Sequence, residues 1–121
     1  MNIIITGASK GIGRAVTEKF AANGYTLFLC ARTEIALASL AKELAAQYPE
    51  STVHYTACDV SVKEEVIRFA EWVLSKTSAP GILVNNAGSF TPGNVHDEAD
   101  GLLEQMMATN LYSAYYLSRA L

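Results

Sequence analysis

The sequence is poor in the residues and patterns that mark specialised classes of protein. It has two cysteines, Cys30 and Cys58, whose spacing fits neither a C-x-x-C motif nor a metal site, which argues against a disulfide scaffold. The net charge of −3 argues against a general affinity for nucleic acid or anionic membranes. No apolar run approaches the ~20 residues of a membrane-spanning helix. We therefore expect two buried, reduced thiols, no metal, and no nucleic-acid or membrane partner.

The chain also shows none of the marks of a secreted or multidomain protein. An apolar, β-branched run begins at Ile3, which leaves no room for a signal peptide and predicts a cytoplasmic protein. No linker or repeat interrupts the 121 residues, and 50% of them are hydrophobic. That length suffices for one globular core but not for two. We therefore predict a single domain over residues 1–121.

Strand and helix patterns alternate along the whole chain. Apolar runs predict strands at residues 3–5, 25–31, 52–57 and 82–85, and helical periodicity predicts helices after residues 10, 33, 61 and 99. Strands separated by helices run parallel with right-handed crossovers, which predicts an α/β fold with a doubly wound parallel sheet. We expect the strand order 3-2-1-4, with a ligand at the crevice between strands 1 and 4, where the order reverses.

The segment between the first strand and the first helix is rich in glycine. Residues 6–13 read TGASKGIG, with the spacing G-x-x-x-G-x-G, which differs from the common G-x-G-x-x-G fingerprint. Glycine lets the backbone turn sharply and approach an anion, and a helix that opens at Gly11 directs unpaired N–H groups toward that anion. We interpret the segment as a phosphate-binding loop, followed by a helix that carries Ile12, Val16 and Phe20 at helical spacing.

The later helices carry cap residues and apolar stripes. Thr33 is placed to cap the second helix, and Ser61 with Glu64 matches an S-x-x-E capping box at the start of the third. On the third helix we expect the apolar side chains at residues 62, 66, 69 and 73 to be buried. The last helix carries a similar stripe over residues 103–121.

Charged residues at the strand ends indicate which nucleotide the crevice accepts. Arg32 lies about twenty residues after the glycine loop, where NAD-binding sites place an acid for the ribose 2′-hydroxyl. A guanidinium suits a 2′-phosphate instead, and Lys10 adds a second cation. The acid Glu34 falls in the first turn of a helix, where a negative charge is stabilising anyway. The alternative for Arg32 is a solvated surface side chain, and we favour the phosphate role and therefore NADP(H).

Two other strand ends are polar. Asp59 either starts the following helix or accepts a hydrogen bond from the amino group of adenine, and the sequence leaves both possibilities open. Residues 85–88 read NNAG directly after a buried strand, where adjacent asparagines are costly unless they bind a ligand or brace a motif.

Asn110 is polar within the stripe of the last helix. It lies seven residues from both Leu103 and Leu117, so it is either a satisfied core asparagine or an anchor for water or a catalytic group. His54 and His96 lie in a strand and in a polar loop, and we assign them packing or surface roles.

These motifs together resemble those of the short-chain dehydrogenase/reductase family. The glycine loop is similar to the family's T-G-x-x-x-G-x-G, Asp59-Val60 to its adenine-contacting D-V pair, and residues 85–88 to its NNAG signature. Asn110 is at the position of the family's active-site asparagine, and Lys10 and Arg32 resemble the basic residues of its NADP(H)-preferring members. The resemblance implies cofactor contacts at Gly7, Ser9, Lys10, Gly11, Ile12, Gly13, Arg32, Asp59, Val60, Asn86, Ala87 and Gly88.

The resemblance also implies a reaction. Family members have a Rossmann-like domain, commonly form homodimers or homotetramers, and move a hydride between a nicotinamide and the carbonyl or alcohol carbon of a small molecule. A serine polarises the substrate, a tyrosine beside a lysine acts as acid and base, and the asparagine holds a water of the proton relay. A phenol, whose usual pKa is about 10, needs such a neighbouring cation to work at neutral pH. We expect the loop at residues 89–97 to border the substrate.

The sequence departs from the family because it contains no Tyr-x-x-x-Lys segment. Tyr112, Tyr115 and Tyr116 are followed four residues later by tyrosine, arginine and alanine. We therefore expect residues 1–121 to be the cofactor-binding part of a longer reductase, truncated before that segment. The alternative is a short nucleotide-binding or subunit-pairing protein without turnover. A methyltransferase of similar topology fits less well, because Arg32 replaces the acid that such enzymes use on the ribose.

Overall fold

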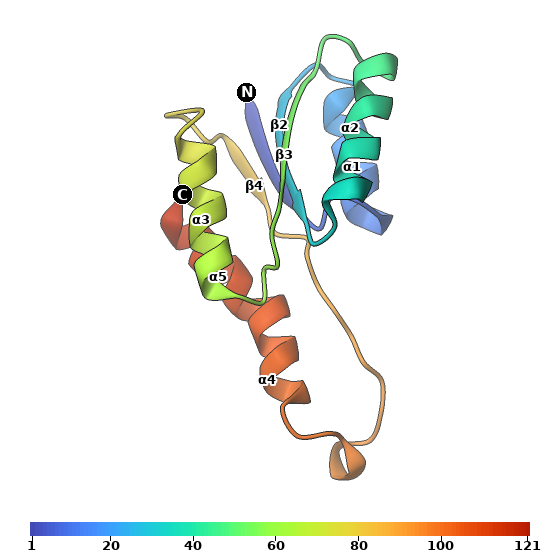
Figure 1. The fold of residues 1–121 in the computed structure, drawn as a ribbon, viewed down its shortest axis with the longest axis vertical. Coiled ribbons are helices and arrows are strands. Elements are labelled where there is room, and N and C mark those ends of the chain that lie inside the picture. The colour runs from blue at the N-terminus through green and yellow to red at the C-terminus, as the bar shows by residue number, and fades with distance from the viewer.

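The fold is a parallel sheet with helices on both of its faces (Figure 1). The computed structural model describes residues 1–121. Its elements are β1 (Asn2–Thr6), α1 (Gly11–Ala21), β2 (Thr26–Ala31), α2 (Glu34–Gln47), β3 (Thr52–Ala57), α3 (Lys63–Leu74), β4 (Ile82–Val84), η1 (Val95–Asp97), α4 (Leu102–Met107), η2 (Ala108–Tyr112) and α5 (Ser113–Ala120). The four strands are ordered β3-β2-β1-β4. The predicted α/β fold and strand order are therefore confirmed.

The core forms two layers because side chains alternate along the strands. Ile3 and Ile5 of β1 pack with α1 and α2, whereas Ile4 packs with α3 and α5 on the other face. Successive side chains of a strand point to opposite faces, so one short apolar run supplies both layers. β2 lies between two strands and is buried on both faces from Leu27 to Ala31, as its continuous apolar run predicts.

The sheet brings four loops together at one edge. β1 pairs in parallel with β2 and β4, and β2 pairs in parallel with β3. The carboxyl ends of parallel strands lie at the same edge, so the segments that follow all four strands converge there (Figure 1). This edge holds the site described below.

The apolar residues at helical spacing along α1 are not the ones that it buries. Ile12 is 76% exposed, while Val16 and Phe20 are only partly buried against the core. The residues that α1 buries are Gly13, Thr17 and Ala21. A Cβ atom at Gly13 would collide with the carbonyl oxygen of Gly7, so α1 approaches the glycine loop closely through its small side chains.

The last helix is interrupted by a π-helical turn, η2, between α4 and α5. Such a turn holds one more residue than an α-helical turn and rotates the residues on either side relative to each other. The predicted stripe over residues 103–121 is consequently wrong before and within the turn: Leu103 is 59% exposed and Asn110 is exposed, whereas Leu117, after the turn, is buried. α4 also extends beyond the end of the sheet (Figure 1). None of the helices is both long enough and apolar enough to cross a membrane.

Candidate nucleotide-binding site

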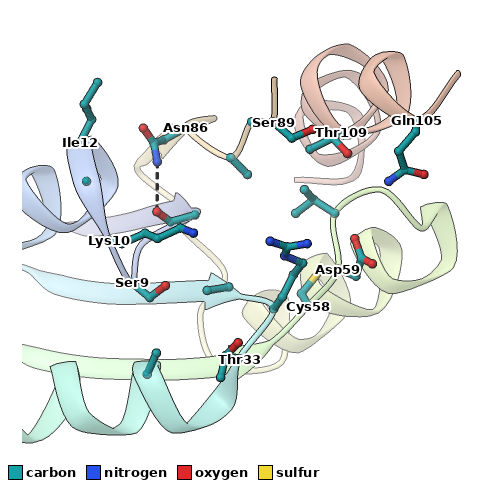
Figure 2. Close-up of a pocket in the computed structure, with 18 residues that line it drawn as sticks. Ser9, Lys10, Ile12, Thr33, Cys58, Asp59, Asn86, Ser89, Gln105 and Thr109 are labelled. Carbon is teal, nitrogen blue, oxygen red and sulfur yellow. Dashed lines mark hydrogen bonds between the residues drawn. The ribbon is translucent and has the colours of Figure 1, made fainter. Parts of the chain in front are cut away.

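A cleft of about 570 Å³ lies at the carboxyl ends of the strands (Figure 2). The glycine loop, the ends of β2, β3 and β4, and the last helix all contribute to its walls. The predicted cofactor residues that line it are Gly7, Ser9, Lys10, Gly11, Ile12, Arg32, Asp59, Val60, Asn86, Ala87 and Gly88. Two predicted residues, Gly13 and Asn110, lie outside the lining. The lining residues that sequence reasoning did not assign to the site are Ala31, Thr33, Ala36, Cys58, Ser89, Gln105 and Thr109.

The glycine loop has a backbone that only glycine adopts readily. Gly7 and Gly11 have φ angles of 63° and 58°, in the left-handed region. A Cβ atom at Gly7 would lie 2.9 Å from the Cα atom of Ala87, whereas a Cβ atom at Gly11 would meet nothing within 4 Å. A side chain at Gly7 would therefore collide with the backbone of Ala87, whereas Gly11 leaves open space at the start of α1. Gly11 and Ile12, the first residues of α1, line the cleft, and the first N–H groups of a helix, which have no acceptor within it, favour an anion.

Asn86 braces the glycine loop from the end of β4. Its Nδ2 atom donates to the carbonyl oxygens of Thr6 and Gly7, at 3.2 and 3.1 Å, as the dashed line in Figure 2 partly shows. The Thr6 hydroxyl oxygen accepts from the backbone N–H groups of Asn86 and Ala87, at 3.1 and 3.0 Å. Of the two roles left open for NNAG, the side chain of Asn86 thus has the bracing role. It joins two segments almost eighty residues apart.

Two cationic and two hydroxyl side chains line the cleft. Ser9 and Lys10 come from the glycine loop, Arg32 and Thr33 follow β2, and neither Lys10 nor Arg32 takes part in an ion pair within the chain. Glu34 does not line the cleft. Thr33 is the N-cap residue of α2, as predicted, but its side chain makes no capping hydrogen bond, so its hydroxyl is available to the cleft. Two uncompensated cations and two hydroxyl groups in the same cleft are suited to binding a phosphate.

The β3 end carries Asp59 in a fixed orientation. Its Oδ1 atom accepts from the backbone N–H and the hydroxyl of Ser61, at 3.0 and 2.7 Å. The predicted capping box of Ser61 and Glu64 is therefore wrong, because the Ser61 hydroxyl bonds to Asp59. α3 begins only at Lys63, and Val62 is 37% exposed instead of buried. Oδ2 of Asp59 makes no hydrogen bond within the chain, so one carboxylate both starts the turn and offers an acceptor to the cleft.

Asn110 holds the loop after β4 against η2. Its Oδ1 atom accepts from the backbone N–H of Ser89, and its Nδ2 atom donates to the Ser89 carbonyl oxygen, both at 2.7 Å. Asn110 is exposed, so the interpretation as a buried core asparagine is wrong. A Cβ atom at Gly88 would lie 3.3 Å from Oδ1 of Asn110, so the glycine allows this close approach.

The two cysteines lie next to each other beneath the cleft. Both are free and buried, as predicted, and only Cys58 lines the cleft. A hydrogen bond with Cys58, together with burial, raises the pKa of the Cys30 thiol well above its usual value. The same hydrogen bond from Cys30 lowers the pKa of the Cys58 thiol. Cys58 is consequently the thiol that ionises first.

Comparisons with known proteins agree with this geometry. A model of the family described as short chain dehydrogenase matches residues 1–121. Granaticin polyketide synthase putative ketoacyl reductase 1 from Streptomyces violaceoruber is 35% identical, with 96% of this chain and 42% of that protein covered. Senescence-associated protein 13 from Arabidopsis thaliana is 38% identical, with 98% and 44% covered. The chain thus spans less than half the length of these curated relatives.

Solved structures with the same fold include nucleotide complexes. L-sorbose reductase from Gluconobacter frateurii, in complex with NADPH and L-sorbose, matches with a TM-score of 0.94 and 33% identity, covering 99% of this chain and 45% of that one. An alcohol dehydrogenase from the archaeon Thermococcus sibiricus, in complex with 5-hydroxy-NADP, matches with a TM-score of 0.93 and 32% identity, covering 98% and 50%.

Proposed function

The chain belongs to the short-chain dehydrogenase/reductase family, a family of NAD(P)-dependent oxidoreductases, and we propose that residues 1–121 bind NADP(H) for a carbonyl reductase or alcohol dehydrogenase. The observation that carries the cofactor assignment is Arg32, which enters the cleft without an acidic partner from the end of β2. An acid there would favour a ribose 2′-hydroxyl, whereas a guanidinium favours a 2′-phosphate. Lys10 adds to the same positive charge.

The residues that line the cleft supply groups for the phosphates and the adenine of the cofactor. The N-terminus of α1 and the open space at Gly11 accept the pyrophosphate, and Lys10 and Arg32 bind the 2′-phosphate. Oδ2 of Asp59 and the backbone N–H of Val60 line the region left for the base. When bound, the nicotinamide supplies or accepts the hydride. The chain's own part in the reaction is to bind and orient that cofactor.

Asn110 has a positioning role in this proposal. Its side chain is committed to Ser89, so it holds the loop after β4 beside the cleft, and in the whole protein it anchors the water of the proton relay. The tyrosine and lysine of that relay do not occur as a Tyr-x-x-x-Lys segment within residues 1–121. We therefore propose the activity of the whole protein, and its small-molecule carbonyl or alcohol substrate, from its family and not from catalytic residues within 1–121.

Calorimetric titration with NADPH and NADH tests the cofactor assignment. We expect tighter binding of NADPH, and we expect Arg32→Ala to weaken NADPH binding about tenfold or more while leaving NADH binding unchanged, because only the 2′-phosphate contact is lost. Arg119→Ala is the matched control, since Arg119 lies on α5 and bonds to the hydroxyl of Tyr115. Tighter binding of NADH by the unaltered protein would overturn the assignment.

Residues 1–121 contain no Tyr-x-x-x-Lys segment, so a second proposal is that these residues by themselves bind the nucleotide without turnover. Absorbance of NADPH in the presence of a carbonyl substrate separates the two. The 121-residue protein should bind NADPH without oxidising it. Steady oxidation by this protein would show that residues within it complete the chemistry, which would contradict the division of roles proposed above.

A further inference from the structure

The last helix contributes polar side chains to the wall of the cleft, and these residues belong to none of the sequence motifs described above. Gln105 of α4 and Thr109 of η2 are one turn apart and both line the cleft. Figure 2 shows the Gln105 side-chain amide directed into the space between the helix and the end of β3. This amide makes no hydrogen bond within the chain. Its neighbours differ, because Thr109 bonds to Ser113 and Asn110 bonds to Ser89. It is therefore a free donor and a free acceptor.

The opposite wall also holds unused hydrogen-bonding groups. Oδ1 of Asp59 is occupied by Ser61, but Oδ2 has no partner within the chain. The backbone N–H of Val60 likewise has no acceptor, although Val60 is only 8% exposed. The N–H of Asp59 is different, since it donates to Glu65. Both residues line the cleft, so these two groups are available to a ligand that enters it.

Adenine presents a pattern that matches both walls. Its amino group carries two hydrogens, and each lies beside a ring acceptor, N1 on one side and N7 on the other. Asp59 Oδ2 and the Val60 N–H offer an acceptor and a donor to the side with N1. A glutamine amide pairs with the other side by donating to N7 and accepting from the amino group, a pairing that proteins also use to recognise adenine in DNA.

We propose that Gln105 is a specificity-determining residue that binds the N7 edge of the adenine. The inference rests on the proposed NADP(H) binding and adds a residue from outside the recognised motifs. Gln105 is exposed in the free protein, and the base would cover it and be held between β3 and α4. The last helix would then contact the bound cofactor directly.

A cycle of one protein change and one ligand change tests this contact. The ligands are NADPH and its 7-deaza-adenine analogue, in which carbon replaces N7 and the acceptor is lost. We expect the unaltered protein to bind the analogue about 3- to 10-fold more weakly, the effect of one neutral hydrogen bond. Gln105→Leu should bind NADPH more weakly by a similar factor and should not distinguish the two ligands. Gln105→Glu, which lacks the N–H donor, should also fail to distinguish them.

Two controls separate failure of this inference from failure of the proposed function. Gln47→Leu, at the exposed C-terminal end of α2 and outside the cleft, should retain the full preference for NADPH over the analogue. If Gln105→Leu keeps that preference as well, Gln105 does not bind N7 and the inference is wrong, while NADPH binding itself stands. If the unaltered protein binds no NADPH, the proposed function fails and this inference fails with it.

Discussion

Asn86 shows how much of the site depends on a single side chain. Its amide joins the end of β4 to the glycine loop through two carbonyl oxygens. We expect Asn86→Ala to lower the free energy of unfolding by about 1–3 kcal/mol, because partly buried carbonyl groups lose their donor. Urea unfolding measures this loss. Asn23→Ala is the control, since Asn23 donates to an exposed carbonyl oxygen of its own helix and should cost far less. Equal effects of the two changes would contradict the bracing role.

The reactivity of the Cys58 thiol can be used to detect whether the cleft is occupied. Its pKa is lowered by the hydrogen bond from Cys30, and it lines the cleft, whereas Cys30 is fully buried and has a raised pKa. We expect N-ethylmaleimide to modify Cys58 before Cys30, because the thiolate is the reactive form. Bound NADPH should slow this modification. Mass spectrometry of peptides from labelled protein, with and without NADPH, tests both points, and earlier modification of Cys30 would contradict the assignment.

At the scale of elements, the contact between α1 and the glycine loop decides where the helix lies. A Cβ atom at Gly13 would collide with the backbone of Gly7 and with the side chain of Asn86. We expect Gly13→Ala to lower the free energy of unfolding by about 1–3 kcal/mol, because the helix has to move away from the loop. The displaced loop should also bind NADPH more weakly. Calorimetry and urea unfolding measure the two effects.

The control for this prediction lies on the same helix. Ala15→Ser changes an exposed position of α1 and should alter the free energy of unfolding by no more than about 0.5 kcal/mol. Were Gly13→Ala to unfold and bind NADPH like the unaltered protein, the close packing of α1 on the loop would be disproved.

Elements also differ in how well their sequence predicts them. The bounds of β3 and the two-sided burial of β2 follow from local patterns, because the order of apolar and polar residues along a strand predicts which of its faces are buried. The faces of α1 and of the last helix do not follow. Gly13 lets α1 lie closer to the loop than a larger residue would. The π-helical turn η2 breaks the seven-residue spacing that predicts Asn110 on the same face as Leu103 and Leu117. Both effects depend on contacts between elements.

At the scale of the whole molecule, His54 links folding stability to pH. It stacks on Phe28, with ring centroids 4.9 Å apart, and burial together with the charge of Lys76 lowers its pKa in the folded protein. The unfolded chain therefore binds the proton more readily, so the free energy of unfolding falls as pH drops below about 6.5 and is fully restored above it. Urea unfolding between about pH 8 and pH 5.5 measures this slope.

His54→Gln should flatten that pH dependence, since the variant has no titrating ring at this position. The lysine that disfavours the proton, Lys76, also lies over the ring of Trp72, with its Nζ atom 5.5 Å from the centroid. An unchanged slope in the variant would assign the pH dependence to other groups and contradict the role of His54.

The sequence by itself determined where the strands and the glycine loop lie and which family the chain belongs to. These follow from residues close together in the chain: β-branched runs form strands, and glycines at fixed spacing form a turn that approaches an anion. Only the tertiary structure decided which polar groups meet. Asn86 reaches Gly7, Asn110 reaches Ser89, and Gln105 shares a cleft with Asp59. Each of these pairs joins different elements, and their meeting depends on how the helices pack against the sheet, which no local pattern records.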